Sequence, residues 1–278
     1  MTALQSIFDL WNWQSGALLA LPGLLLLDFF LRGTATKPNH RALRIGALAL
    51  FVLAYVSPIG VLANGYLFSA HVLQHLLLLL VIPLCYLLSL RNEVQRNTPF
   101  LQGLQALLST PQIGWLAGLG AMWIWHVPNL CQAAAQNAAF GTLRDASLLL
   151  AGFAFWSPVF SPVRPRRLSP PLAAVYLFSA CFGCTLLGVY ITFTPVSVCP
   201  AFVNPADPLG VLPPIRHLGL TPTADQSLGG LLMWVPPCLI YGGALLQVLG
   251  RWYTPDVTTP LHSDSSSPLL TPFGKAGI

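Results

Sequence analysis

The stretch that decides the fold is Ser69-Ala-His-Val-Leu-Gln-His-Leu-Leu-Leu-Leu-Leu-Val-Ile-Pro83, one of the most apolar runs of the chain. It carries two histidines, His71 and His75, which are four residues apart. On a helix this spacing is about one turn, so both imidazoles lie on one face. Gln74 lies between them and can donate or accept a hydrogen bond. Polar groups at membrane depth are costly and usually face protein or a cavity, so this stretch predicts a membrane helix that carries function.

Composition places the whole chain in the membrane class. Of its 278 residues, 55% are hydrophobic and 8% are charged, whereas soluble domains carry roughly 25% charged residues. Because lipid offers backbone groups no partner, membrane spans form helices. We therefore predict an all-α bundle of seven transmembrane helices. The predicted spans are residues 14–31, 43–63, 68–90, 112–127, 143–161, 171–194 and 227–250.

The remaining segments are expected to be short or irregular. Residues 129–137 follow the fourth span and are interpreted as an interfacial segment, and residues 195–226, rich in proline and glycine, as a loop. We expect residues 1–253 to form a single transmembrane helical domain. Residues 254–278, which contain a serine cluster and several prolines, are interpreted as a disordered cytoplasmic tail.

The basic residues predict the orientation of the spans. Eleven of the thirteen lie on alternate connections, which the positive-inside rule assigns to the cytoplasm. The N-terminus is then outside and the C-terminus inside, and the net charge of +5 is a signal of topology rather than of nucleic-acid binding. The eleven residues are Arg32, Lys37, Arg41, Arg44, Arg91, Arg96, Arg164, Arg166, Arg167, Arg251 and Lys275.

With this orientation, four spans bring polar or metal-binding side chains to the outer leaflet. His71 and His75 lie roughly 5–10 Å below the outer end of their span, at about 1.5 Å per residue. His126 ends the fourth span, Asp145 begins the fifth and Asp225 begins the seventh. Random placement would scatter these groups, so we predict one site in this leaflet.

The histidines suggest a metal site. Two imidazoles at this spacing suit one copper, zinc or iron ion. His126 is a candidate third ligand, or a partner that fixes the tautomer of the first pair. The alternative is that the histidines hydrogen-bond neighbouring helices, and that Trp123 and Trp125 belong to an interfacial aromatic belt.

The carboxylates give a weaker signal. Asp145 and Asp225 lie at helix starts, where the helix dipole favours negative charge, and Asp225 also fits an N-cap position. Arg144 is a local partner for either carboxylate.

The sulfur-containing residues leave further alternatives open. Met233 is a soft ligand for Cu(I), although methionine in a membrane helix is more often packing. Cys181 and Cys184 lie on one face of the sixth span near mid-membrane, where they are either Cu(I) ligands or small buried hydrophobes. Cys131 and Cys199 both fall on the outer side, where a disulfide can form in an oxidising periplasm.

Four motifs in chain order resemble the CtaG family of caa-type cytochrome c oxidase assembly factors. The third span and Pro83 resemble its H-x-x-Q-H segment, and residues 123–128 resemble its W-x-W-H-x-P segment. Residues 155–158 resemble its F-W-x-P segment, and residues 225–234 are similar to its D-Q-x-x-G-G-x-x-M-W signature. These matches cover roughly residues 50–250.

The resemblance implies a seven-span protein of the bacterial inner membrane that assembles haem-copper oxidase, with copper delivery as its proposed role. Family members often have a second histidine pair at the start of the fifth span, where this chain has Gly141 and Asp145. The residues carried over are the candidate ligands His71, His75 and His126 and the motif residues Asp225, Gln226 and Met233.

We therefore predict a multi-pass assembly factor, a copper chaperone and not an enzyme. Its expected partners are oxidase subunits, a periplasmic copper donor and the lipid bilayer, without nucleic acid. One alternative is a membrane b-type cytochrome, with His126 and one histidine of the pair as axial haem ligands. The other is a non-catalytic, oxidase-associated scaffold subunit whose histidines are structural.

Overall fold

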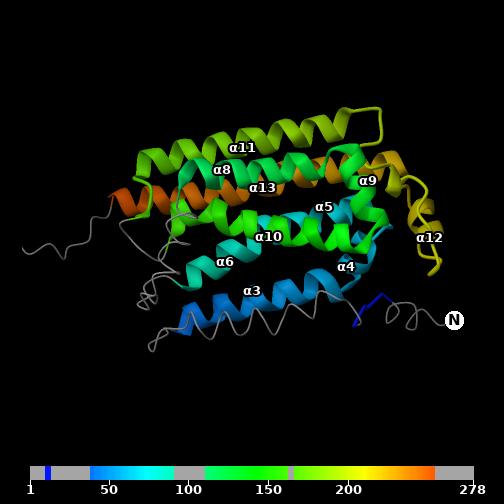
Figure 1. Ribbon diagram of the computed structural model, residues 1–278, viewed down its shortest axis with the longest axis horizontal. Helices are drawn as coiled ribbons and strands as arrows, with labels where there is room; N and C mark the ends of the chain where they lie inside the picture. The colour runs from blue at the N-terminus through cyan, green and yellow to red at the C-terminus, as the bar shows by residue number, and fades with distance from the viewer. Residues whose placement is uncertain (1–9, 14–37, 91–109, 162–165, 254–278) are drawn as a thin grey trace, which may run out of the picture.

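The computed structural model describes residues 10–13, 38–90, 110–161 and 166–253, and these segments contain helices and connections but no strand. The helices run up and down in one bundle, and α4, α9 and α12 lie at the end where α5 begins, which we call the histidine end (Figure 1). The helices are α3 (Pro38–Val56), α4 (Pro58–Ala63), α5 (Phe68–Leu76), η2 (Leu77–Val81), α6 (Ile82–Ser89), α8 (Pro111–Trp125), α9 (Pro128–Gln136), α10 (Ala138–Phe160), α11 (Pro170–Phe193), η4 (Pro200–Phe202), α12 (Leu212–His217) and α13 (Pro222–Tyr253).

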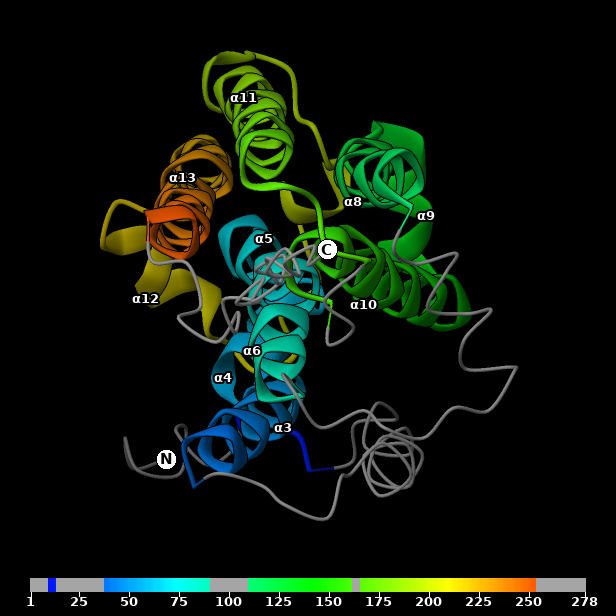
Figure 2. The same ribbon diagram turned by 90° about the vertical axis from the view of Figure 1, so that its left-hand side faces the viewer.

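The helix that carries His71 and His75 occupies the centre of the bundle. α5, η2 and α6 form one continuous span, in which 67% of the apolar window is buried, against 39% or less in the other long apolar helices. Figure 2 looks along the bundle and shows α5 and α6 between α13 and α11 on one side and α10 and α3 on the others. Polar side chains on this span therefore meet other helices rather than lipid.

Four of the described helices are long and apolar enough to cross a membrane, which confirms the all-helical membrane class. They are Phe68–Ser89, Ala138–Phe160, Pro170–Phe193 and Pro222–Tyr253. α3 and α8 lie at two further predicted spans, without meeting the same criteria of length and hydropathy. The first predicted span, residues 14–31, and the predicted tail, residues 254–278, lie outside the described residues.

The predicted span 43–63 is two helices rather than one. The side chain of Ser57 caps α4 by accepting the N–H of Ile59 at 3.3 Å, and Pro58 takes the first helical position, where its missing N–H costs nothing. Arg44, expected in a loop, is buried within α3. The predicted interfacial segment 129–137 is the short helix α9, which begins at a proline.

A π-helical turn, η2, begins two residues after His75. The N–H of Ile82 bonds to the Leu77 carbonyl, five residues back. Pro83 has no N–H to give the Leu79 carbonyl, so the regular helical ladder is interrupted here. Gly152 on α10 fits against this turn, because a β-carbon there would meet the Leu79 carbonyl and, at 2.7 Å, the Pro83 ring. Such π turns often occur at functional sites.

Candidate metal centre

Three histidines meet at the histidine end, as predicted. The ring centroids of His71 and His75 are 4.1 Å apart, and those of His75 and His126 are 5.4 Å apart. α5 supplies the first two rings one turn apart, and the C-cap position of α8 supplies the third. All three side chains are 3% exposed or less, so this is a buried imidazole cluster.

Most ring nitrogens of this cluster have no hydrogen-bond partner among the described residues. These are both nitrogens of His71, both of His75, and Nε2 of His126. The Ala63 carbonyl lies near His71, but neither nitrogen meets it with hydrogen-bond geometry. Nδ1 of His126 donates to the Met122 carbonyl at 2.7 Å, which leaves its Nε2 lone pair free to bind a metal.

The rings are close without being arranged around one ion. In the described segments, no group of three or more histidine, cysteine, aspartate or glutamate side chains has the geometry to hold a metal. Gln74, also buried, donates from Nε2 to the Ala54 carbonyl at 2.8 Å and so joins α5 to α3. A metal would therefore require the imidazoles to rotate toward a common point.

An ion pair between buried Arg144 and partly buried Asp145 lies beside the cluster. Arg144 is 3% exposed, and its charge acts on all three imidazoles. Its Nε donates to Oδ1 of Asp145 at 2.8 Å, and the Tyr55 hydroxyl also hydrogen-bonds this carboxylate. Of the two carboxylates left open as partners of Arg144, the structure selects Asp145, and both residues lie inside α10 rather than at its start. The carboxylate offsets the positive charge that would otherwise repel a metal ion.

α10 packs tightly at Gly141 and Asp145, the positions where the resemblance implied a second histidine pair. Gly141 is buried against α9, and a β-carbon there would lie 3.0 Å from the Ala134 carbonyl. Asp145 is engaged in the ion pair. α10 therefore places the Arg144–Asp145 ion pair beside the cluster and contributes no imidazole to it.

Asp225 caps a helix, but not its own. Its carboxylate accepts the backbone N–H groups of Phe68 at 2.7 Å and of Ser69 at 3.1 Å, and also the Ser69 hydroxyl. The N-cap position of α13 is taken by Thr221, whose hydroxyl accepts from Ala224. Asp225 lies in the first turn of α13, as predicted, but the N-cap position suggested for it is wrong. The residue fixes the start of α5, one turn before His71.

The other two motif residues on α13 have different surroundings. Gln226 accepts from the Val198 N–H at 2.9 Å and donates to the carbonyls of Ile191, Thr194 and Val196, so it holds the connection that follows α11. Met233 is fully buried. Asp225 is level with Phe68, and α13 and α5 run in the same direction (Figure 1), so Met233 lies at about the depth of His75, roughly 10–12 Å further along.

The cysteines of the sixth span do not join the histidines. Cys181 contacts Cys238 and Cys184 contacts Tyr241, both on α13. Cys238 is five residues beyond Met233, so it lies ~8 Å further along the helix than the level of His75, at 1.5 Å per residue. The structure thus separates Cys181 and Cys184 from the imidazole cluster.

A covalently anchored segment covers the cluster. Cys131 and Cys199 form a disulfide, with 5.6 Å between their Cα atoms, which ties α9 to the connection after α11. Three residues later, the Phe202 ring packs on His71 with a centroid distance of 5.0 Å and on Phe68 at 5.9 Å. Phe202 could not be identified from the sequence, because nothing in a proline-rich connection distinguishes a covering ring from an ordinary one.

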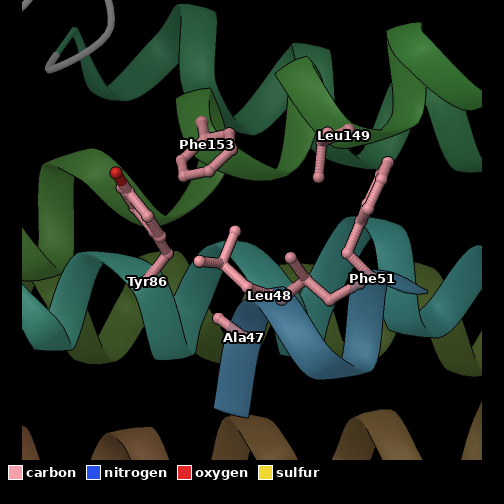
Figure 3. A pocket seen from close by; sticks show the side chains of 7 residues that line it. Ala47, Leu48, Phe51, Tyr86, Leu149 and Phe153 are labelled. Carbon is pink, nitrogen blue, oxygen red and sulfur yellow. The ribbon is translucent and has the colours of Figure 1, made fainter. Parts of the chain in front are cut away.

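The pocket in Figure 3 lies away from the histidines, between α3, α6 and α10. Its lining is aliphatic and aromatic, with Tyr86 supplying the one hydroxyl. None of the predicted ligands faces it, so it offers no metal chemistry. The residues that line it are Ala47, Leu48, Phe51, Ile82, Tyr86, Leu149 and Phe153.

The fold and the cluster define an all-helical membrane protein with buried imidazoles at one end of its bundle. The chain belongs to the cytochrome c oxidase caa3 assembly factor family (Caa3_CtaG), whose model matches residues 30–255. The match confirms the resemblance of the four motifs and takes in every helix described above. A search of curated proteins and a search of solved structures each found no match.

Proposed function

We propose that this assembly factor carries copper as cargo between His71, His75 and His126 and passes it to a haem-copper oxidase at the outer face of the bacterial inner membrane. The proposal rests on three buried imidazoles in contact, five of whose ring nitrogens have no hydrogen-bond partner in the part of the chain that the structure describes. A purely structural role would pair these nitrogens with neighbouring helices. Each buried donor left unpaired costs about 1–3 kcal/mol, which a bound ligand can offset.

Small movements are sufficient to make a three-nitrogen site. Imidazole nitrogens bind such metals at about 2.0–2.1 Å, and the ring centroids are 4.1 and 5.4 Å apart. Rotation of the rings of His71 and His75 brings one nitrogen of each toward Nε2 of His126. A site that must be assembled by rotation suits a carrier, because the same rotation releases the ion.

The surroundings supply charge compensation and cover. Asp145 balances Arg144, so an entering copper ion meets a pair with little net charge. Phe202 lies over His71 and keeps water from the rings. Release then requires this ring to move, and the disulfide three residues earlier limits how far the segment can travel.

The proposal includes a topology of seven spans, with the N-terminus outside and the C-terminus inside. It is supported by the alternation of basic residues along the chain and by the disulfide at the histidine end, since an oxidising compartment favours such bonds. The oxidase and its copper donor then approach from the same outer side.

Copper titration of the purified protein tests the proposal. Full-length protein in lipid nanodiscs is titrated anaerobically with Cu(I) against a chromogenic chelator, and compared with the His71→Ala/His75→Ala double variant. His217→Ala is the matched control, because this histidine is exposed on α12. We expect one tightly bound copper in the wild type and the control, and none in the double variant.

Two outcomes would overturn the proposal: no copper bound by a folded wild type, or equal binding by the double variant. A Soret band in the purified protein would instead support the haem alternative. A planar haem bound between two of these histidines would have to push apart rings whose centroids are 4.1 and 5.4 Å apart.

A further inference from the structure

A second group of sulfur-containing side chains lies where α11 packs against α13. The two helices approach closely at their small residues: a β-carbon on Gly188 would lie 2.8 Å from the Gly230 carbonyl oxygen. Two turns further along, the Sγ atoms of Cys181 and Cys238 are 3.0 Å apart. Neither cysteine belongs to the disulfide at the histidine end.

The sulfur–sulfur distance favours a dithiol over a metal site. Two sulfurs bound to one ion at about 2.3 Å each are held roughly 4.0–4.6 Å apart, for trigonal and linear geometry respectively. A disulfide needs about 2.05 Å. The two Sγ atoms, 3.0 Å apart, must approach each other by about 1 Å to form a disulfide, whereas they must move apart to bind a metal ion.

The pair lies deep in the apolar part of the bundle. Cys181 is the twelfth residue of the 24-residue α11, so it is ~17 Å from either helix end. Both cysteines are half-buried, and their neighbours Phe178 and Leu239 are 71% and 73% exposed on the apolar outer surface. A reagent that reaches this position must dissolve in lipid.

We propose that Cys181 and Cys238 are a redox pair that a lipid-soluble oxidant of the quinone class converts to an interhelical disulfide. The two S–H bonds break and one S–S bond forms. The two electrons and two protons pass to the quinone, which becomes the hydroquinone. The product locks α11 to α13, the helix whose Asp225 caps α5.

Thr185 is placed to assist the transfer. Its Oγ1 donates to the Cys181 carbonyl at 2.9 Å and lies 3.6 Å from Sγ of Cys238. Because its own hydrogen is engaged, the hydroxyl oxygen is free to accept the Cys238 S–H. Cys184, by contrast, meets the Tyr241 hydroxyl at 3.6 Å and is not a member of the pair.

Thiol counting tests the proposal without copper, so its outcome is independent of the proposed copper site. Full-length protein in nanodiscs is incubated anaerobically, with a metal chelator, with and without decylubiquinone. It is then denatured, alkylated and analysed by peptide mass spectrometry. We expect the four free cysteines, Cys85, Cys181, Cys184 and Cys238, to fall to two, with a linked peptide joining residues 181 and 238 and one hydroquinone formed per protein.

The variants separate this pair from its neighbours. Cys181→Ser and Cys238→Ser each abolish the loss of thiols, whereas the matched controls Cys85→Ser and Cys184→Ser still lose two. The proposal fails if the wild type keeps four thiols under quinone, or if the linked peptide joins other cysteines. Equal melting temperatures of the serine variants without quinone exclude misfolding as the cause.

Discussion

Replacing Asp225 tests the link between α13 and the histidine helix. Its carboxylate accepts three hydrogen bonds at the start of α5, from two backbone N–H groups and one hydroxyl. Hydrogen bonds to a charged group contribute about 1.5–3 kcal/mol each, and an unpaired buried donor costs about 1–3 kcal/mol. Since Ser69 can turn its hydroxyl elsewhere and the terms are not additive, we expect Asp225→Ala to lower the free energy of unfolding by about 3–5 kcal/mol. Asp225→Asn keeps one acceptor oxygen and should lose about 1–2 kcal/mol.

Asp207 provides a matched control for this experiment. Its carboxylate caps the short peripheral helix α12 by accepting the N–H groups of Val211 at 3.0 Å and Leu212 at 2.9 Å. Asp207→Ala should cost about 1 kcal/mol, as for an ordinary N-cap. Unfolding by sodium dodecyl sulfate in mixed micelles measures the three variants on one scale. Equal losses for Asp225→Ala and Asp207→Ala would refute the claim that the carboxylate of Asp225 holds the centre of the bundle.

Three further perturbations follow from the site and the π turn. Phe202→Ala removes the cover and should speed copper release on the order of tenfold, and because the ring is buried it should also lower the unfolding temperature. Stopped-flow transfer to a chelator, well below that temperature, measures the rate, and an unchanged rate would contradict the role of the ring. Gly152→Ala should lower the free energy of unfolding by about 1–3 kcal/mol, because the added methyl meets η2. The control Gly120→Ala has open space around it and should not. Similar melting temperatures of the two variants would count against the close packing. Asp145→Asn leaves the charge of Arg144 uncompensated and should weaken Cu(I) binding about tenfold, or about 1.4 kcal/mol. Competition titration measures the affinity, and tighter binding would contradict the role of Asp145 in charge compensation.

The all-helical membrane class and the histidine pair of the site were predictable, because both depend on the local pattern of residues along the chain. Apolar runs of membrane length identify helices wherever lipid excludes other backbone partners. The helical period puts His71 and His75 on one face, and the chain order of the motifs indicated the family that the match confirmed.

The boundaries of some helices were harder to predict, because hydropathy averages over short interruptions. The break at Ser57 lies in an apolar run, and only its side-chain cap and the following proline mark it. Arg44 was assigned to a loop by its charge, but the structure buries it within α3. η2 depends on the missing N–H of Pro83 together with a glycine on another helix.

By itself, the sequence determined that the chain is an all-helical membrane protein and that two imidazoles lie on one face of its most apolar span. It also indicated the family to which the chain belongs. Only the tertiary structure decided that Asp225 caps a helix 156–157 residues away, that Phe202 covers His71, and that Cys181 meets Cys238. The physical reason is that periodicity specifies which face of a helix is polar or apolar. The register and rotation of one helix against another come from the packing of whole surfaces, to which small residues such as Gly152 and Gly230 contribute as much as the polar ones.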